Sequence, residues 1–171
     1  IMMPHSSGNN ITVGSSLTHD VPIWKFDKVP DNIKADVILV ACFPCKLPKA
    51  FLSSKAQTSL NIHPSWLPDY RGPAPLFWQL RDGVRNPGVT VHHVTAEIDA
   101  GDIVTQKRVY LPEGASSQES DRLLAHTGAA LVINILNTAD FTCKPQMGAG
   151  SHQSWPTEED WHIPTDWTVQ R

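Results

Sequence analysis

Residues 35–64 read ADVILVACFPCKLPKAFLSSKAQTSLNIHP and decide the fold class. Residues 37–43 are rich in β-branched side chains, which is typical of a strand buried on both faces of a parallel sheet. Pro48 indicates the start of a short helix, and residues 60–62 are expected to form the next strand. A strand, a helix and a second strand at this spacing predict a right-handed crossover between parallel strands. The protein is therefore expected to have an α/β fold.

The later part of the chain alternates in the same way between helical and extended patterns. Ser116, followed three residues later by Glu119, is the signature of a capping box and marks a helix start. The chain after Met147 has no regular period. We expect the later elements at these positions: a helix at 74–83, strands at 89–95 and 103–110, and a helix from 117 to about 137.

Length, charge and cysteine content narrow the class of protein. A chain of 171 residues suits one domain. Its net charge of −3 and the lack of a long basic run give no indication of a surface that binds nucleic acid or anionic membranes. Three cysteines form no disulfide framework and indicate a reducing compartment. The longest apolar run is far shorter than the ~20 residues of a membrane helix. We therefore expect a cytoplasmic protein, or an organellar one if a targeting segment precedes this sequence.

A polar pair lies at the end of the second predicted strand. Asn61 and His63 are two residues apart, so in a strand they share one face, with α-carbons about 6.5 Å apart. Pro64 ends the strand, and ligands of open α/β sheets bind at the carboxyl ends of strands. An amide can hold a developing oxyanion and an imidazole can move a proton, which suits acyl-type transfer. Alternatively, Asn61 caps a turn and His63 is an ordinary, partly buried histidine.

The longer motif carries a family resemblance. Residues 61–75, NIHPSWLPDYRGPAP, together with residues 97–103, EIDAGDI, resemble the folate-dependent formyltransferases, closest to the methionyl-tRNA formyltransferase branch and its relatives. The resemblance extends from residue 37 to residue 146. It implies an open, largely parallel Rossmann-like sheet of the formyltransferase type. The first strand–helix–strand unit of that family is not visible ahead of residue 37.

The resemblance also implies a catalytic set. The catalytic asparagine, histidine and aspartate of the family fall on Asn61, His63 and Asp99. In the family the formyl donor is 10-formyltetrahydrofolate and no metal is needed. Asn61 and His63 would hydrogen-bond the oxygen of the tetrahedral intermediate. Asp99 would orient and charge-stabilise His63 and assist proton removal through a water.

The same resemblance implies the folate-binding residues, and the position of Arg71 beside the catalytic loop suggests a contact with the acceptor. Arg71 would hold an anionic part of the acceptor or pair with Asp69. Pro44 replaces a glycine that many members carry, which removes one backbone donor near the pterin. The predicted folate-binding positions are Cys45, Lys46, Leu47, Val94, Thr95, Ala96, Glu97 and Ile98.

The expected organisation has three parts. Residues 1–20 form an irregular, possibly truncated segment, residues 21–147 form the formyltransferase catalytic core, and residues 148–171 form a connector towards a further domain outside this chain. The acceptor implied is an amine, first that of initiator methionyl-tRNA. A sugar-nucleotide amine, hydrolysis of formyl-folate, or an inactive folate-binding fragment are the alternatives, and the oligomeric state is open.

Two further patterns allow other interpretations. Cys42 and Cys45 have the spacing of a redox pair, and a structural zinc would need two more ligands. His92 and His93 are adjacent in a predicted strand and must face opposite ways, so they form no same-face ligand pair. We expect one of the two histidines to be packed and the other exposed.

Overall fold

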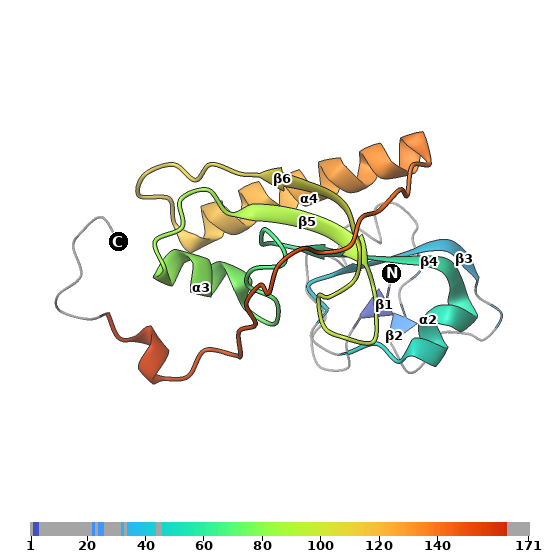
Figure 1. Ribbon diagram of the computed structural model, residues 1–171, viewed down its shortest axis with the longest axis horizontal. Coiled ribbons are helices and arrows are strands. Elements are labelled where there is room, and N and C mark those ends of the chain that lie inside the picture. The colour runs from blue at the N-terminus through green and yellow to red at the C-terminus, as the bar shows by residue number, and fades with distance from the viewer. Residues whose placement is uncertain are drawn as a thin grey trace.

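The computed structural model describes residues 2–3, 22, 24–25, 32, 34–43 and 46–163 (Figure 1). Its strands are β1 Met2–Met3, β2 Trp24–Lys25, β3 Ala35–Ala41, β4 Ala56–His63, β5 Gly88–His93 and β6 Ile103–Arg108. Its helices are α2 Lys49–Lys55, α3 Pro75–Arg81, α4 Ser117–Thr138 and a 3-10 turn at Glu159–Trp161. Each element predicted from residue 37 onward is present, with boundaries shifted by at most four residues.

The main sheet has the strand order β3-β4-β5-β6. Strands β3 and β4 are parallel and joined through α2, as the sequence predicts. The expectation of a largely parallel sheet holds only for this pair, because β5 is antiparallel to both β4 and β6. The connection between β5 and β6 spans residues 94–102, which is too short for the crossover that parallel strands require. The α/β fold is confirmed, and its described sheet is mixed.

The amino-terminal part differs from its prediction at two residues. Met2–Met3 form strand β1, which pairs in parallel with Trp24–Lys25, although residues 1–20 are predicted to be irregular. A two-residue strand is defined by backbone pairing alone and leaves no alternation in the sequence by which to find it. The other residues of the predicted irregular segment lie outside the described residues.

Helix α4 starts at the predicted capping box. The backbone N–H of Glu119 donates to Ser116 Oγ over 3.2 Å, and the backbone N–H of Ser116 donates to Glu119 Oε2 over 2.8 Å. The two bonds pair backbone N–H groups that the start of a helix would otherwise leave without an acceptor. The helix ends at Thr138, and the residue that caps it, Ala139, has a φ of 50° in the left-handed region.

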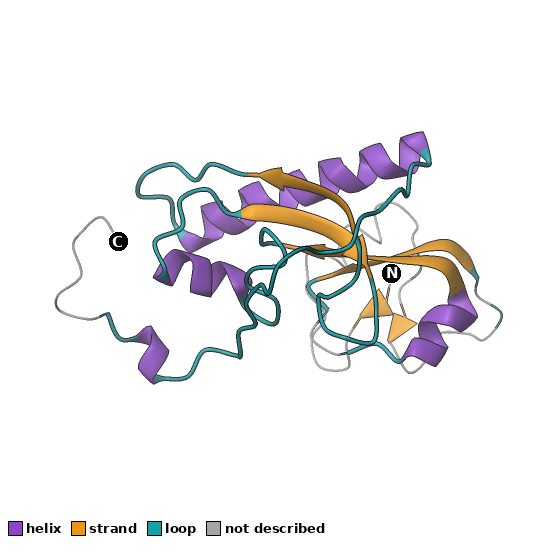
Figure 2. Ribbon diagram, in the orientation of Figure 1, coloured by secondary structure: helices purple, strands orange, loops and turns teal. Residues whose placement is uncertain are grey.

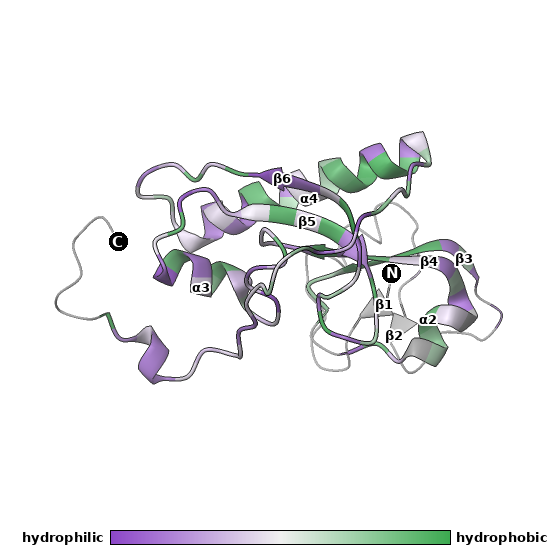
Figure 3. Cartoon of the chain, viewed as in Figure 1, coloured by the Kyte–Doolittle hydropathy of each residue, from purple (hydrophilic) through white to green (hydrophobic). Residues whose placement is uncertain are grey.

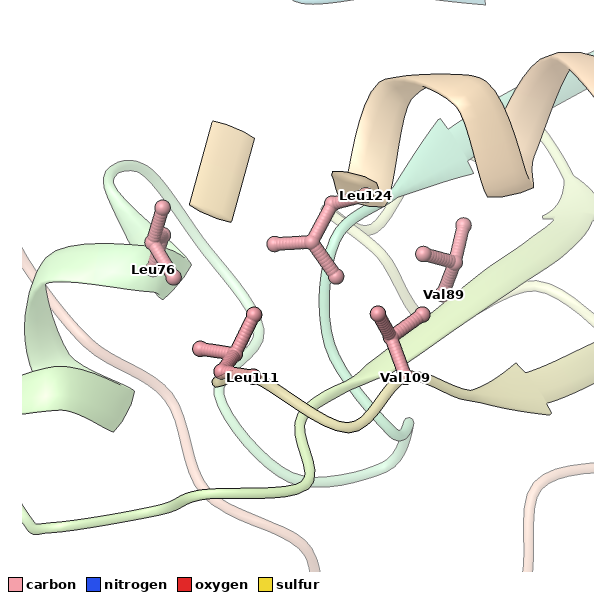
Figure 4. Packing of buried hydrophobic residues seen from close by; sticks show 5 residues of the cluster. All are labelled: Leu76, Val89, Val109, Leu111 and Leu124. Atoms are coloured by element: carbon pink, nitrogen blue, oxygen red, sulfur yellow. The ribbon is translucent and has the colours of Figure 1, made fainter. Parts of the chain in front are cut away.

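The core lies between α4 and the sheet. Figure 2 shows α4 running along the sheet, with α3 and α2 near opposite ends of the molecule, and Figure 3 shows apolar residues on β5 and on α4. Two buried clusters form this core, one of Leu76, Val89, Val109, Leu111 and Leu124 (Figure 4) and one of Leu60, Val91, Val132 and Ile135. Burying each such side chain contributes about 1.5–3 kcal/mol.

A glycine allows α4 to approach the sheet closely. A Cβ added at Gly128 would lie 2.6 Å from Ile62 Cγ2, so helix and strand β4 meet where the helix has no side chain. This contact fixes β4 at the residue between Asn61 and His63. None of the helices in the described ranges is long and apolar enough to cross a lipid bilayer.

Candidate active site

Three side chains predicted to act together meet at the carboxyl end of β4. Asn61 and His63 lie on one face of this strand, and Asp99 lies in the loop between β5 and β6. Asp99 has a φ of 52°, a left-handed conformation that costs a non-glycine residue about 1–3 kcal/mol. The surrounding hydrogen bonds must hold it there.

Asp99 is the centre of this group. Its Oδ1 accepts a hydrogen bond from Asn61 Nδ2 over 3.1 Å, and its Oδ2 accepts one from the backbone N–H of Gly72 over 2.8 Å. His63 Nδ1 lies 3.4 Å from the same Oδ2, and the two side chains are only 5% and 10% exposed. The carboxylate therefore joins both residues of β4 to the loop that follows the strand.

Two influences oppose each other on His63. Burial lowers the pKa of His63 below its ordinary value, although the charge of Asp99 and the hydrogen bond to the Tyr70 carbonyl favour the protonated form. The Tyr70 carbonyl lies 2.8 Å from Nε2 and can only accept, so Nε2 carries a hydrogen. The neutral ring then has its lone pair on Nδ1, beside Asp99.

The charge of Asp99 is stabilised despite its burial. Burial raises the pKa of Asp99, but contacts with His92, His63 and the Gly72 N–H lower that pKa below the usual range for an aspartate. Asp99 is therefore a carboxylate near neutral pH. It can stabilise a positive charge on a neighbouring imidazole.

His92 is a fourth member of the site that the sequence did not reveal. Its side chain is 2% exposed, and Nε2 lies 3.1 Å from Asn61 Nδ2 and 3.5 Å from Asp99 Oδ1. Its Nδ1 donates to the His93 carbonyl over 2.9 Å, so in the neutral ring Nε2 accepts from Asn61. The signal lies in the antiparallel register, which places His92 directly opposite Asn61.

This arrangement fixes the Asn61 amide. One hydrogen on Nδ2 points to a carboxylate and the other to an imidazole lone pair, so exchanging Nδ2 with Oδ1 would place an oxygen against both acceptors. The expectation for the adjacent histidines is met in part, since His92 is buried, whereas His93 is half-buried and lines a cavity.

An open cavity of about 670 Å³ lies beside this cluster. Ser59, which shares a face of β4 with Asn61 and His63, forms part of its wall. Five predicted folate-binding residues also line it, namely Lys46, Leu47, Val94, Thr95 and Ala96. The other lining residues are Pro48, Leu52, Ser53, Ala56, Gln57, Thr58 and His93.

Two predicted folate positions do not line this cavity. Glu97 and Ile98 are exposed and outside the cavity wall, and Cys45 lies outside the described residues together with Pro44. The suggested redox pair of Cys42 and Cys45 therefore stays a hypothesis. The described part of the chain contains no group of three or more histidine, cysteine or acidic side chains that could hold a metal ion.

Arg71 lies on the loop after β4, but its guanidinium points to a neighbour that the sequence did not indicate. Its Nε and Nη2 donate to Gln146 Oε1 over 3.1 and 2.7 Å. Pairing with Asp69 was one expectation, and the described contacts of the guanidinium are with Gln146 instead. A role for Arg71 in holding the acceptor stays a prediction.

Comparison with known proteins places these features in a family. The family model described as formyl transferase matches residues 24–136. A methionyl-tRNA formyltransferase of Ehrlichia canis (strain Jake) is 33% identical over 134 residues, which cover 77% of this chain and 43% of that protein. One of Ehrlichia chaffeensis (strain Arkansas) is 31% identical over 157 residues, which cover 91% and 50%. The chain thus spans about half the length of the curated relatives it matches.

Solved structures share the fold. The methionyl-tRNA formyltransferase of Clostridium thermocellum superposes with a TM-score of 0.72 and 18% identity, covering 99% of this chain and 78% of that one. The formyltransferase PseJ of Anoxybacillus kamchatkensis, solved with a formamido sugar nucleotide and tetrahydrofolate, gives a TM-score of 0.67 and 20% identity, covering 94% and 88%. At these identities the likeness concerns the fold.

Proposed function

Because the chain belongs to the formyl transferase family, we propose that it carries the catalytic centre for moving a formyl group from 10-formyltetrahydrofolate to an amine. The observation that carries this proposal is the meeting of Asn61, His63 and Asp99 next to a cavity lined by five predicted folate-binding residues. An amide, an imidazole and a carboxylate in contact are the groups that acyl transfer without a metal requires.

The cavity suits a folate in size and lining. Its volume of about 670 Å³ falls within the roughly 300–1,000 Å³ of small-molecule sites. Its wall contains both apolar side chains, such as Leu47, Leu52 and Val94, and polar ones, such as Gln57 and Ser59. The folate would supply an activated formyl carbon, and residues 94–96, which line the cavity, would face its ring system.

Asn61 is proposed to hold the formyl oxygen. Of its two N–H donors, the one on Asp99 fixes the orientation of the side chain. The other points to His92 Nε2, and redirecting this hydrogen bond to the formyl oxygen would stabilise the negative charge that develops there. Asn61 stays neutral over the whole working pH range, so this donor needs no particular protonation state.

His63 is proposed to take the proton that the amine loses. As the amine nitrogen bonds to the formyl carbon and the bond to the folate nitrogen breaks, one proton leaves the amine and one joins the folate nitrogen. The neutral ring of His63 has its lone pair on Nδ1, and a proton bound there lies beside Asp99 Oδ2 at 3.4 Å. The carboxylate stabilises the imidazolium that forms.

The acceptor is proposed to be the amino group of methionyl-tRNA. The curated relatives at about 30% identity carry that name, which supports this acceptor over others. A sugar-nucleotide amine is the second candidate, because solved structures with sugar nucleotides share the fold. Water is the third, which would make the protein a formyl-folate hydrolase.

One assay tests the activity and the acceptor together. Release of tetrahydrofolate from 10-formyltetrahydrofolate is followed with methionyl-tRNA, with amino-sugar nucleotides and with water, for the wild type and for His63→Ala. We expect release that requires methionyl-tRNA and is lost in the variant. Release with a sugar nucleotide would reassign the acceptor, and release without an amine would indicate hydrolysis. Folate binding without any release would contradict the proposed activity.

A further inference from the structure

Gln146 links the two loops that carry the site. Its Oε1 accepts the two hydrogen bonds from Arg71, and its Nε2 donates to the backbone carbonyls of Asp99 and Gly101 over 2.7 and 2.8 Å. Guanidinium nitrogens only donate and carbonyls only accept, so the neighbours determine which amide atom is which. All four contacts an amide can make in this plane are formed.

The backbone around Gln146 is fixed on both sides. We call residues 144–153, which follow α4 and return past the sheet in Figure 1, the return segment. Lys144 exchanges two backbone hydrogen bonds with Ile103 at 2.8 and 2.9 Å. Further on, the Ser151 N–H donates to Pro68 O, and the Ser151 carbonyl accepts from the Arg71 N–H over 3.0 Å. Gln146 therefore projects from an anchored backbone.

Both loops held by Gln146 reach Asp99. The Asp99 carbonyl is a direct partner of Gln146 Nε2. Arg71, the partner of Oε1, precedes Gly72, whose N–H donates to Asp99 Oδ2 over 2.8 Å. A Cβ at Gly101 would collide with the His93 carbonyl, so the loop also sits tightly against β5. Gln146 thereby fixes both the backbone and the carboxylate of Asp99, a non-glycine residue held at positive φ.

We infer that Gln146 is a positioning residue that sets the distance between the Asp99 carboxylate and His63, through the Asp99 carbonyl on one side and Arg71–Gly72 on the other. The expected effect of Gln146 on the rate of formyl transfer rests on the proposed function. Gln146 itself touches neither nitrogen of His63 nor the cavity wall. Its effect on His63 passes through Asp99.

The test uses the full chain with two substitutions and a matched control. Gln146→Met removes all four hydrogen bonds at similar volume. Gln146→Glu keeps an acceptor for Arg71 but removes the donor to the Asp99 and Gly101 carbonyls. Gln118→Met makes the same change at an exposed glutamine on α4. The first readout is the NMR titration of His63 without folate, assigned by comparison with His63→Gln. The titratable groups facing His63 are Asp99 and His92.

We expect His63 to titrate at lower pH in Gln146→Met, because a displaced Asp99 stabilises the imidazolium less, whereas in Gln146→Glu the added carboxylate charge acts in the opposite direction. Formyl transfer by these variants should show kcat reduced about 10- to 100-fold, the scale of a misplaced catalytic group, with KM for the folate unchanged. Gln118→Met should match the wild type in both readouts. A wild type without formyl transfer would refute the proposed function, whereas the His63 titration would still test the positioning role.

Three results would overturn the inference. The His63 titration and kcat could stay unchanged in Gln146→Met, or both Gln146 variants could fail to fold, which would make Gln146 a residue of the fold alone. Alternatively, Gln146→Glu could behave like the wild type while Gln146→Met does not. The contact with Arg71 would then suffice, and the bond to the Asp99 carbonyl would have no positioning role.

Discussion

The backbone carbonyl of Tyr70 accepts a hydrogen bond from Nε2 of His63 over 2.8 Å, with Tyr70 held at a φ of 59°. This contact leaves Nδ1 as the nitrogen that gains or loses a proton, and Nδ1 is the atom that faces Asp99. The Ser151 hydroxyl accepts a hydrogen bond from the Tyr70 N–H over 2.8 Å, which helps to hold the backbone of Tyr70 in place. The backbone of Tyr70 thus determines which ring nitrogen of His63 gains or loses a proton.

Stability should depend on pH through His63 and Asp99. The folded pKa of His63 lies below its unfolded value of about 6.5, so the unfolded chain binds the proton first as pH falls, and stability decreases from about pH 6.5 downward. The lowered pKa of Asp99 gives stability above about pH 4 that is lost on further acidification. Urea unfolding between about pH 2 and pH 8 measures both.

A matched pair of variants tests whether His63 causes the loss of stability that begins near pH 6.5. His63→Gln should abolish the decrease in unfolding free energy just below pH 6.5, and His126→Gln, at an exposed position on α4, should retain it. Equal pH slopes for the two variants would show that another group causes the decrease.

Asp99→Asn should reduce turnover while sparing folate binding. The neutral amide cannot stabilise the protonated His63, and general acid–base contributions are typically 10²- to 10⁴-fold, so kcat should fall within about that range. Asp99 does not line the cavity, so the folate Kd should stay near the wild-type value. Steady-state kinetics and equilibrium binding check this, with Asp102→Asn, an exposed carboxylate nearby, as control. A large loss of folate affinity in Asp99→Asn would speak against the assignment.

Ser59→Phe should fill part of the cavity and weaken folate binding. An aromatic ring is compatible with a strand position, so the unfolding free energy should change little. We expect the Kd for 10-formyltetrahydrofolate to rise at least about tenfold, which corresponds to 1.4 kcal/mol. Leu136→Phe, which enlarges a half-exposed side chain on α4, is the control. Unchanged binding in Ser59→Phe would place the folate elsewhere.

Thr90→Val should destabilise the protein although it keeps the side-chain shape. The buried hydroxyl of Thr90 donates to the Ser65 carbonyl over 2.7 Å and accepts from the Leu67 N–H and from Gln106 Nε2. Leaving buried partners unsatisfied costs about 1–3 kcal/mol, measurable by urea unfolding. Thr105→Val on β6, where the side chain is half-buried, should cost less than about 1 kcal/mol. A neutral Thr90→Val would mean that water satisfies these groups.

The sequence predicts the parts of the site that depend on local periodicity. Asn61 and His63 share a face because strand side chains alternate, and the capping box at Ser116 locates the start of α4. Asp99 was predicted through the family motif rather than through any spacing. His92 was missed because its position opposite Asn61 depends on an antiparallel register, which no single strand reveals.

Gln146 was missed for a different reason. It lies in a segment without periodicity, 75 residues after Arg71, and a contact over such a separation leaves no local pattern. The mixed sheet has a similar explanation, since the direction of β5 depends on how the chain turns after α3. Backbone direction and long-range contacts are set by tertiary packing, and residue type alone does not encode them.

The long separation between Arg71 and Gln146 sets the order in which the centre is completed during synthesis. A ribosome adding roughly 5–20 amino acids per second makes the 75 residues between them in about 4–15 s. Throughout that interval the nascent chain already contains Asn61 and His63 but lacks the Gln146 amide that holds the Asp99 loop. The reactive side chains are thus synthesised before the residue that aligns them. A chain released before residue 146 would contain Asn61, His63 and Asp99 without the Gln146 contacts that position Asp99.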